Sequence, residues 1–379
     1  MESLPFAFGR LADAEHFIDR DAERARLARN FASGVNTAIV SPRRWGKSSL
    51  VARVAADVMA SDRGIKVCLV DAFNVRDEAG FYAQLAQGVV AATSTKWDDA
   101  AQVIKQFLGR LRPTISVGDA VTSHVTFDLD WQEAVRNPDE VLDLAENVAV
   151  ARGIRVVVCI DEFQAVAGFK ESLAFQRKLR SHWQAHQHVT YCLYGSRRHM
   201  LTEIFTDASM PFYRFGDVML LGKIDNACWG DFIVARFAST GKTITTADAC
   251  RLASLVGNHS YYVQQLALQA WFRTQDTCTP QIVDAALNDL ADQLGLLFVS
   301  LAETLSAKQL SLLRAVLDGV SELSSQPVLS RYRLGTSANV VRMKQALAAK
   351  EIIDVTPAGI ELLDPMFAFW LRRDLFRCG

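Results

Sequence analysis

The stretch that decides the fold is TAIVSPRRWGKSSLVARVAADVM, residues 37–59. Residues 37–41 are apolar or small in succession, which is typical of a strand covered on both faces. Residues 47–59 place their apolar side chains on one face of an amphipathic helix. The segment between them, PRRWG, has the composition of a turn. A strand, a turn and a helix start carrying Gly46-Lys47-Ser48 are the local structure of a phosphate-binding loop.

This loop lacks the first glycine of the usual pattern, in which a glycine and four further residues precede Gly-Lys-Ser/Thr. Ser41 stands at that position, and a serine there is strained if the backbone has a positive φ. The phosphate-binding groups remain: the N–H groups of the helix start, the Lys47 cation for the β and γ phosphates, and the Ser48 hydroxyl for Mg²⁺. Gly46 lets the phosphates approach the backbone closely. The residues expected to contact a nucleotide are Ser41, Pro42, Arg43, Arg44, Trp45, Gly46, Lys47, Ser48 and Ser49.

A second motif, RVVVCIDEFQ (155–164), supplies two acidic residues. Asp161 and Glu162 follow a buried strand, at the end where ligands bind in parallel sheets. Asp161 is expected to hold Mg²⁺ through water, and Glu162 to orient or deprotonate an attacking water. Acidic residues at a strand end also serve as caps or turn formers. The catalytic interpretation therefore depends on the phosphate-binding loop upstream.

The distribution of apolar runs predicts the fold class. Runs of successive apolar residues alternate with helical patterns, which indicates a three-layer α/β/α core with a parallel sheet. The runs lie at 37–41, 65–73, 154–161, 189–196 and 217–224.

Three regions follow one another along the chain. We expect a core over 1–225, with an inserted β-hairpin at 112–130 of undecided role, and a helical lid over 226–294 in which the strand pattern stops. The remaining region, 295–379, reads as a winged helix, because helical patterns precede two short β-like pieces around Pro357-Ala358-Gly359.

Composition excludes several classes of protein. The 379 residues carry 41 basic and 42 acidic side chains, so no overall charge favours nucleic acid or a membrane surface. No stretch approaches the roughly 18 uncharged apolar residues of a membrane helix, and the N-terminus lacks the order of a signal peptide. Seven cysteines form no C-x-x-C pair, and Cys68, Cys159 and Cys192 lie in apolar runs. We expect a cytoplasmic protein with reduced thiols and no membrane partner.

Several motifs together resemble a known family. They are FIDRDAERARL (17–27), SPRRWGKSSL (41–50), IDEFQ (160–164), YGSRRHMLTEIF (194–205), MPFYRF (210–215), GNHSYYVQQLA (257–267) and DPMFAFWLRR (364–373). Their order resembles that of the archaeal and bacterial ATPases of the STAND group, relatives of AAA+ and Orc/Cdc6-like proteins. The resemblance spans nearly the whole chain and implies a P-loop ATPase core, a helical lid and a C-terminal winged helix, with ATP or ADP and Mg²⁺ as ligands.

The resemblance also implies roles for residues outside the loop. Phe17, Ile18 and Arg20 match positions near the adenine, although a capped surface helix explains the same pattern. Ser196 or Arg197 stands where relatives carry a sensor of the γ-phosphate, at a strand end that is also compatible with a polar residue without a ligand.

Two further positions carry open alternatives. Arg214 lies where relatives present an arginine finger to the nucleotide of a neighbouring subunit, which would require a nucleotide-dependent oligomer, but a lone arginine before a strand is usually solvated. His259 matches a lid histidine that touches the β-phosphate, yet Ser260 replaces the proline that follows it in relatives, so Asn258 or Ser260 is a candidate helix cap.

Two other features have weaker functional interpretations. HWQAHQH (182–188) places His182 and His186 at a spacing that can hold zinc, with His188 nearby, but it offers no fourth ligand. The winged helix carries Arg331, Arg333, Arg342 and Lys344, which suit DNA phosphates. Many such modules instead pack only against the ATPase core.

The sequence therefore predicts a Mg²⁺-dependent ATPase that acts as a molecular switch. Hydrolysis changes the orientation of the lid and winged helix and thereby the affinity for an unknown protein client. The alternative is a DNA-associated regulatory ATPase that binds DNA through the winged helix, with SANVVRMKQALAAK (337–350) as its recognition helix. A third hypothesis, an interaction module with an inactive site, rests only on Ser41 and Ser260.

Overall fold

The computed structural model describes residues 4–9, 17–94, 97–109, 114–116, 126–128, 137–356 and 359–376. It divides the chain into two compact units. We call Arg20–Gly222 the core unit, and Met1–Asp19 together with Lys223–Gly379 the C-terminal unit.

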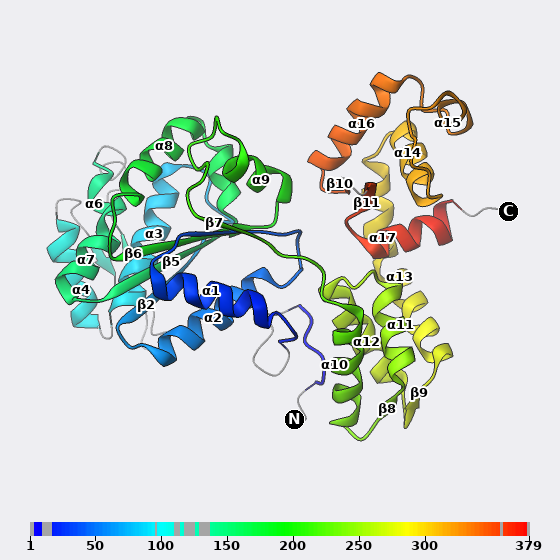
Figure 1. Cartoon of the computed structure of the whole chain (residues 1–379), viewed down its shortest axis with the longest axis horizontal. Coiled ribbons are helices and arrows are strands. Elements are labelled where there is room, and N and C mark those ends of the chain that lie inside the picture. Colours follow the sequence, from blue (N-terminus) through cyan, green and yellow to red (C-terminus); the bar gives the residue numbers. More distant parts are fainter. Residues whose placement is uncertain are drawn as a thin grey trace. The chain divides into compact units, whose positions relative to one another are not determined.

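A five-stranded parallel sheet forms the centre of the core unit (Figure 1). Its order is β2-β5-β6-β1-β7, so β6 lies between the strand before the phosphate-binding loop and the strand before the acidic pair. All five strands begin within two residues of the apolar runs found in the sequence. Their bounds are β1 Thr37–Val40, β2 Ile65–Asp71, β5 Arg155–Asp161, β6 Val189–Gly195 and β7 Asp217–Leu220.

The register brings the functional strand ends to one edge of the sheet. Val40 at the end of β1 pairs with Gly195 at the end of β6, and Ile160 near the end of β5 pairs with Leu193. The residues that follow β1, β5 and β6 therefore emerge at the same carboxyl edge.

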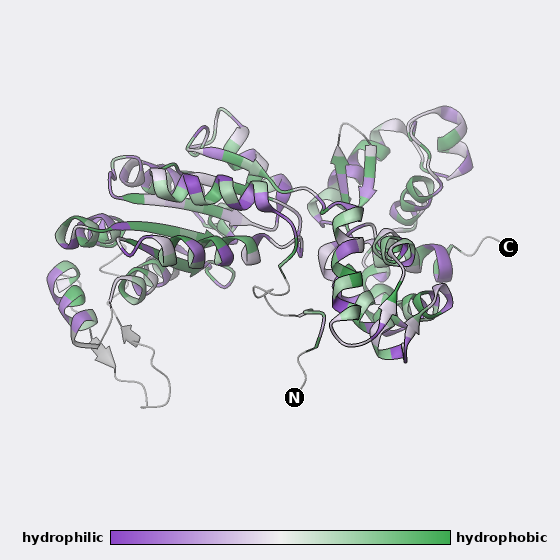
Figure 2. Ribbon diagram, turned by 60° about the horizontal axis from the view of Figure 1, so that its bottom comes forward, coloured by the Kyte–Doolittle hydropathy of each residue, from purple (hydrophilic) through white to green (hydrophobic). Residues whose placement is uncertain are grey.

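Helices cover both faces of this sheet, with hydrophobic strands between them (Figures 1 and 2). Leu50, Val51 and Val54 of α2 are buried, as the helical pattern predicts. The helices of the core unit are α1 Asp21–Ser33, α2 Lys47–Ser61, α3 Glu78–Thr93, α4 Trp97–Phe107, α6 Asp139–Leu142, α7 Leu144–Arg152, α8 Ser172–Trp183 and α9 Arg198–Thr206. A 3₁₀ turn at Phe163–Gly168 follows the acidic pair directly.

The predicted hairpin lies largely outside the described residues. Within it the structure describes β3 Thr114–Ser116 and β4 Thr126–Asp128, which pair antiparallel. Cys68, Cys159 and Cys192, expected to be reduced and buried, are free thiols in the core of the sheet.

Within the C-terminal unit, the region from Lys223 to Glu303 consists mainly of helices. They are α10 Asn226–Ala238, α11 Thr246–Leu255, α12 Ser260–Arg273 and α13 Pro280–Glu303. Thr245 caps α11 by accepting a hydrogen bond from the backbone N–H of Asp248. The expectation that the strand pattern stops here is wrong in detail, because β8 Thr243–Ile244 and β9 Thr277–Cys278 form a short parallel pair. Two-residue strands leave too little periodicity to be recognised.

The boundary expected between lid and winged helix, at residues 294 and 295, falls inside α13. Gly295 does not end this helix, which continues for two further turns to Glu303. Buried side chains from both halves, including Leu290, Phe298 and Phe367, belong to one hydrophobic cluster. The lid and winged helix therefore share a helix and a core.

The winged helix has the predicted order of elements. Its helices are α14 Ala307–Leu317, α15 Gln326–Arg331 and α16 Ser337–Ala349, and its wing is the antiparallel pair β10 Ile353–Thr356 and β11 Gly359–Leu362. Ser306 and Gln309 form a capping box at the start of α14. α17 Pro365–Trp370 closes the module, with Asp364 accepting hydrogen bonds from the N–H groups of Met366 and Phe367.

The prediction that the core begins at residue 1 is wrong. Met1–Asp19 belongs to the C-terminal unit. Phe6 is buried there, with its ring 6.1 Å from that of Phe232 and 5.8 Å from that of Phe237. Apolar contacts with helices far along the chain explain the assignment, and the local sequence pattern contains no sign of them.

Candidate functional site

The phosphate-binding loop connects β1 to α2 at the carboxyl edge of the sheet. Gly46 precedes α2 with φ 90° and ψ 11°, a left-handed conformation that suits glycine. Among the described residues no side chain caps this helix start by a hydrogen bond. The N–H groups of a first helical turn have no acceptor within the helix itself, so a helix start at this edge of the sheet suits an anion.

Ser41 does not have the backbone conformation that would require glycine. The positive φ values in this loop belong to Arg44, at 62°, and Gly46. Ser41 is fully buried, and its hydroxyl donates to the carbonyl of Pro42 at 3.1 Å. The missing glycine therefore costs no backbone strain at this position; the strained residue of the loop is Arg44.

Ser48 and Asp161 meet across the carboxyl edge. The Ser48 hydroxyl donates to Asp161 Oδ2 at 2.6 Å, and the backbone N–H of Glu162 donates to Oδ1 at 2.8 Å. Burial raises the pKa of Asp161, although the Ser48 hydrogen bond and the Lys47 charge oppose this. A hydroxyl and a carboxylate oxygen in contact are the hard ligands that Mg²⁺ prefers, so this pair fits the ion. No group of three His, Cys, Asp or Glu side chains suited to a metal exists in the described part of the chain.

Glu162 lies at the centre of a network of polar contacts. Its backbone has a left-handed φ of 52°. Its Oε1 lies 3.9 Å from the Nζ of Lys47, a cation whose side chain is only 7% exposed. Its Oε2 accepts hydrogen bonds from the Ser196 hydroxyl at 2.8 Å, from the Ser196 backbone N–H at 3.3 Å and from the side-chain amide of Gln164.

The two sensor candidates are placed differently. Ser196 is buried and joins Glu162 to the loop, because its hydroxyl also accepts a hydrogen bond from Arg43 Nε at 3.1 Å. Arg197 is exposed at the start of α9, where its guanidinium contacts the sulfur of Met200 at 3.7 Å. Of these two sensor candidates, Ser196 is the one with a described hydrogen bond to Glu162.

Arg20 holds the backbone of the loop. It is buried with a left-handed φ of 72°, and its guanidinium donates to the carbonyl of Gly222 at 2.6 Å and to that of Trp45 at 3.5 Å. An ion pair with Glu23 at 3.0 Å orients the same group. Asp19 does not cap α1, because Arg20 occupies the position before the helix and no described side chain caps it. Phe17 and Ile18 belong to the C-terminal unit, where Ile18 packs against the hydrophobic core.

The remaining site candidates lie apart from this network. Arg214 is exposed, has a left-handed φ of 53°, and stacks over the ring of Tyr213 at 5.1 Å. Because it precedes β7, it lies at the amino edge of the sheet, opposite the loop of its own chain. His259 is buried in the C-terminal unit directly before α12, 5.0 Å from the ring of Tyr262. His259 itself occupies the position before α12, and its side chain makes no capping hydrogen bond to the described residues.

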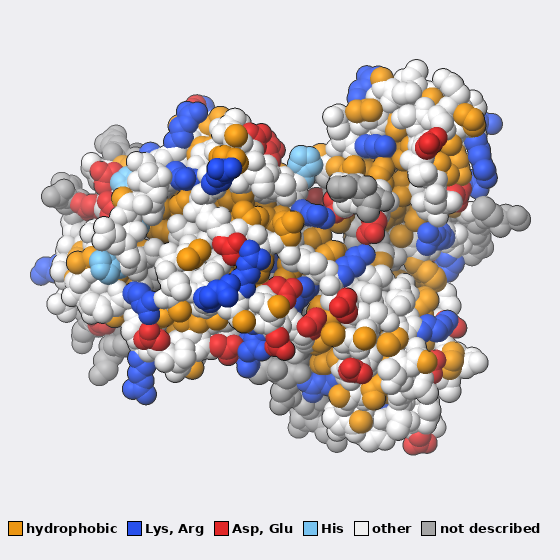
Figure 3. Space-filling model, in the orientation of Figure 1, with side chains coloured by type: hydrophobic (Ala, Val, Ile, Leu, Met, Phe, Trp, Pro, Cys, Tyr) orange, Lys and Arg blue, Asp and Glu red, His pale blue; other side chains and the backbone are white. Residues whose placement is uncertain are grey.

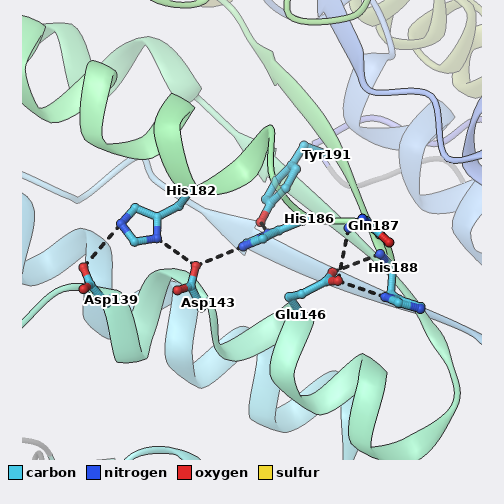
Figure 4. Close-up of polar contacts among 8 residues, drawn as sticks. All are labelled: Asp139, Asp143, Glu146, His182, His186, Gln187, His188 and Tyr191. Atoms are coloured by element: carbon cyan, nitrogen blue, oxygen red, sulfur yellow. Dashed lines mark hydrogen bonds and ion pairs between the residues drawn. The ribbon is translucent and has the colours of Figure 1, made fainter.

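A separate cluster of histidines and acidic residues lies near the amino ends of β5 and β6 (Figure 4). We call it the histidine cluster: His182, His186 and His188 with Asp139, Asp143 and Glu146. Asp143 Oδ1 lies 2.7 Å from His182 Nδ1 and 3.0 Å from His186 Nε2. The other nitrogen of His186 lies 2.8 Å from the Tyr191 hydroxyl.

The rest of the histidine cluster pairs in the same way. His182 Nε2 lies 3.3 Å from Asp139, and His188 Nδ1 lies 2.9 Å from Glu146. Burial by itself would raise the pKa of Glu146, but hydrogen bonds from the side chain and backbone of His188 hold it below its ordinary value. α8 ends at Trp183, so His186 is not on the helix of His182 and the spacing expected for zinc is absent. These histidines bind carboxylates.

The surface shows no single dominant charge on the face seen in Figure 3, where basic and acidic side chains are interspersed. Within the described residues, no helix combines the length and hydropathy needed to span a bilayer.

Comparisons with known proteins agree with this architecture. Residues 296–373 match a family model described as a probable winged helix domain. No curated protein sequence matches the chain. A Walker-type ATPase of Pyrococcus abyssi superposes with a TM-score of 0.68 at 15% identity, covering 97% of this chain and 99% of that one. The ORC2 protein of Aeropyrum pernix, solved with ADPNP and ADP, gives a TM-score of 0.56 at 14% identity, covering 95% and 94%. These likenesses establish the fold: the predicted parallel α/β core with a C-terminal winged helix is confirmed.

Sequence reasoning missed two residues of the site. Gln164 directly contacts Glu162, and its position two residues after the acidic motif is the only sequence signal that pointed to it. The carbonyl of Gly222 is the second, and no side-chain motif marks a backbone acceptor.

Proposed function

We propose that this chain is a Mg²⁺-dependent ATPase that works as a nucleotide-controlled switch. One observation carries the proposal: Ser48 contacts Asp161, and Lys47 lies close to Glu162, at one edge of the sheet. The first pair suits a metal and the second suits a phosphate with its attacking water. The likeness to a Walker-type ATPase supports the same assignment at the level of fold.

The residues divide the chemistry between them. Lys47 and the N–H groups of the α2 start bind the phosphates. Ser48 and Asp161 would hold Mg²⁺, which would supply positive charge beside the phosphate oxygens. Glu162 accepts a proton from water while the water oxygen bonds to the γ-phosphorus. The bond from the γ-phosphorus to the bridging oxygen breaks, and ADP leaves with its electron pair. Ser196 orients Glu162 and senses the γ-phosphate.

We also propose roles for the site candidates that lie outside the network around Glu162. Phe17, Ile18 and Arg20 lie near the adenine, and His259 contacts a phosphate. Arg197 is a second sensor, and Arg214 acts in a nucleotide-dependent oligomer, since it lies at the opposite edge of the sheet from its own loop. Because lid and winged helix share α13, they change orientation together and alter affinity for a protein client. The STAND group remains the proposed subtype.

Hydrolysis is tested by replacing the proposed base. Glu162→Gln keeps the shape and the contacts to Ser196 but removes the basic oxygen, so we expect the rate of phosphate release to fall by about 10²–10⁴-fold with ATP affinity retained. The control is Glu203→Gln, an exposed acid on α9. An unchanged rate removes Glu162 from the mechanism, and a wild-type protein that binds Mg-ATP without releasing phosphate contradicts the ATPase proposal.

DNA binding through the winged helix is a second candidate function. The family match at 296–373 favours it, as do the exposed Arg331, Arg333 and Arg342 on and beside α15 and α16. Gel-shift titration at several salt concentrations is the test. We expect Arg342→Ala to weaken binding and to reduce the salt slope by about one unit. The absence of any shift at low salt, with and without ATP, contradicts this role.

A further inference from the structure

We propose that Gln164 is a positioning residue that selects which oxygen of Glu162 acts as the base. The inference rests on the proposed ATPase function and deepens it. Gln164 is the last residue of the IDEFQ motif (160–164); it is only 6% exposed and lies on the 3₁₀ turn that follows Glu162. Burial deprives the glutamine amide of hydrogen bonds to water, and the donor side of Gln164 makes its bond to Glu162 instead.

The hydrogen bonds of Glu162 are distributed unequally over its two oxygens. Oε2 accepts from Gln164 and twice from Ser196, whereas Oε1 faces Lys47 at 3.9 Å. Three donors occupy the lone pairs of Oε2 and lower its basicity. Oε1 is left as the oxygen that takes a proton, on the side where Lys47 binds phosphate.

Gly195 supplies an independent observation. A Cβ at this position would overlap the Oε1 of Gln164 and lie 3.1 Å from the Cα of Glu162. Gly195 does not have a positive φ, so its backbone does not require glycine. The absent side chain instead makes room for Gln164 against the end of β6. Gln164 Oε1 accepts no hydrogen bond from any described residue, so only the donor side of the amide explains why it is held there.

Gln164 thus acts on the reaction through Glu162. Without its donor, Glu162 can rotate away from Ser196, and the oxygen facing Lys47 is no longer fixed. A misplaced base lowers the rate of the chemical step and leaves ATP binding largely intact, because the loop and Lys47 are unchanged.

The test compares two buried glutamines. Gln164→Met keeps the length and burial but removes the donor, and we expect kcat for phosphate release to fall by about 10–100-fold, with KM and the ATP Kd changed less than about 3-fold. Gln176→Met is the matched control: Gln176 is fully buried on α8, and neither atom of its amide has a partner among the described residues. It should leave kcat unchanged.

A double-mutant cycle separates positioning from a structural role. In a Glu162→Gln background, Gln164→Met should cause no further loss of rate, whereas a structural role would give the same fold-loss in both backgrounds. If Gln164→Met does not fold, the pair Gln164→Ala with Gly195→Ala replaces it, because the new methyl group fills the vacated space; we expect this pair to bind ATP and remain slow.

The outcomes distinguish the two proposals. A wild-type kcat for Gln164→Met, or a full loss of rate in the Glu162→Gln background, overturns the role of Gln164 alone. A wild-type protein that binds Mg-ATP but releases no phosphate overturns both this role and the ATPase proposal.

Discussion

Acidic side chains gather near both ends of β6, but their partners and their pKa shifts differ between the two ends. At the amino end, the acidic residues of the histidine cluster pair with imidazoles, and hydrogen bonds hold the pKa of Glu146 below its ordinary value. At the carboxyl end, burial raises the pKa of Asp161 despite the contact with Ser48 and the charge of Lys47. The negative charge of Glu146 is thus favoured at the first end, and that of Asp161 is disfavoured at the second.

This difference indicates that the carboxyl end, and not the amino end, is the end suited to a ligand. The amino-end acids gain partners on folding and contribute to stability. The carboxyl-end acids lose solvent, and the Nζ of Lys47 lies 3.9 Å from Glu162 beside the helix start that follows Gly46. Such a site lowers the stability of the free protein and regains it when a metal and a phosphate bind. Binding sites are expected to sacrifice stability for function in this way.

The largest effect should come from Lys47→Ala at the carboxyl end. Loss of a buried cation that binds phosphate lowers ATP affinity by on the order of 100-fold, equivalent to about 2.7 kcal/mol. We expect a smaller change, below about 1 kcal/mol, in the free energy of unfolding without nucleotide. Calorimetric titration and thermal unfolding measure the two quantities. A large loss of stability with little loss of affinity would reverse the comparison.

Asp143→Ala should have the opposite profile at the amino end. It removes the oxygen shared by His182 and His186, and the side chain of His186 is only 5% exposed, so a buried polar group loses its partner. We expect the free energy of unfolding to fall by about 1–3 kcal/mol with ATP affinity unchanged. Asp139→Ala is the control, because its side chain is 77% exposed and should cost less than about 0.5 kcal/mol. Weakened ATP binding by Asp143→Ala would show that the two ends are coupled.

Asp161→Asn should stabilise the protein in the absence of nucleotide. An unfolded aspartate ionises near pH 3.9, whereas the raised pKa means that the folded Asp161 ionises at a higher pH. As pH rises from the unfolded to the folded pKa of Asp161, the folded protein loses stability relative to the unfolded chain. The loss persists at higher pH. Asparagine avoids it while still accepting from the N–H of Glu162, so we expect a gain of about 1 kcal/mol at pH 7 that shrinks toward pH 4. Thermal unfolding over this range checks it; a loss of stability at pH 7 would contradict it.

The smallest effect concerns the pH dependence of the histidine cluster. The lowered pKa of Glu146 means that its contribution to stability is present above about pH 4.3, the ordinary value for glutamate, and is lost as pH falls through the lower folded value. Glu146→Gln should therefore cost up to about 1 kcal/mol at pH 6 and progressively less in acid. The size is limited because His188 is 45% exposed and the pair is screened by solvent. An equal loss of stability at pH 6 and in acid would indicate that the substitution acts through packing and not through charge.

Most of the fold was predictable because its strands and helices follow from patterns of neighbouring residues. The five apolar runs marked the strands, and Lys47, Ser48, Asp161 and Glu162 marked the carboxyl edge through motifs of short range. The order of the strands was not predictable, since pairing between β1 and β6 joins segments separated by most of the core.

Contacts between distant segments also explain what the sequence left open. The interpretation of Ser41 depended on a backbone angle, which the structure places outside the left-handed region. The boundary between lid and winged helix was expected at residues 294 and 295, but α13 runs through it to Glu303 and packs into one core on both sides. Gln164 and Gly195 constrain each other only after β5 and β6 lie side by side.

The shared helix α13 has a practical consequence for dissecting the protein. A fragment that follows the family match would begin at residue 296, in the middle of this helix. Such a cut removes Leu290 and Ala291 from the cluster that contains Phe298 and Phe367, and it leaves half-covered apolar surface on both pieces. The lid and winged helix should melt in one cooperative transition, and a fragment that keeps this core intact needs Met1–Asp19 as well as Lys223–Gly379.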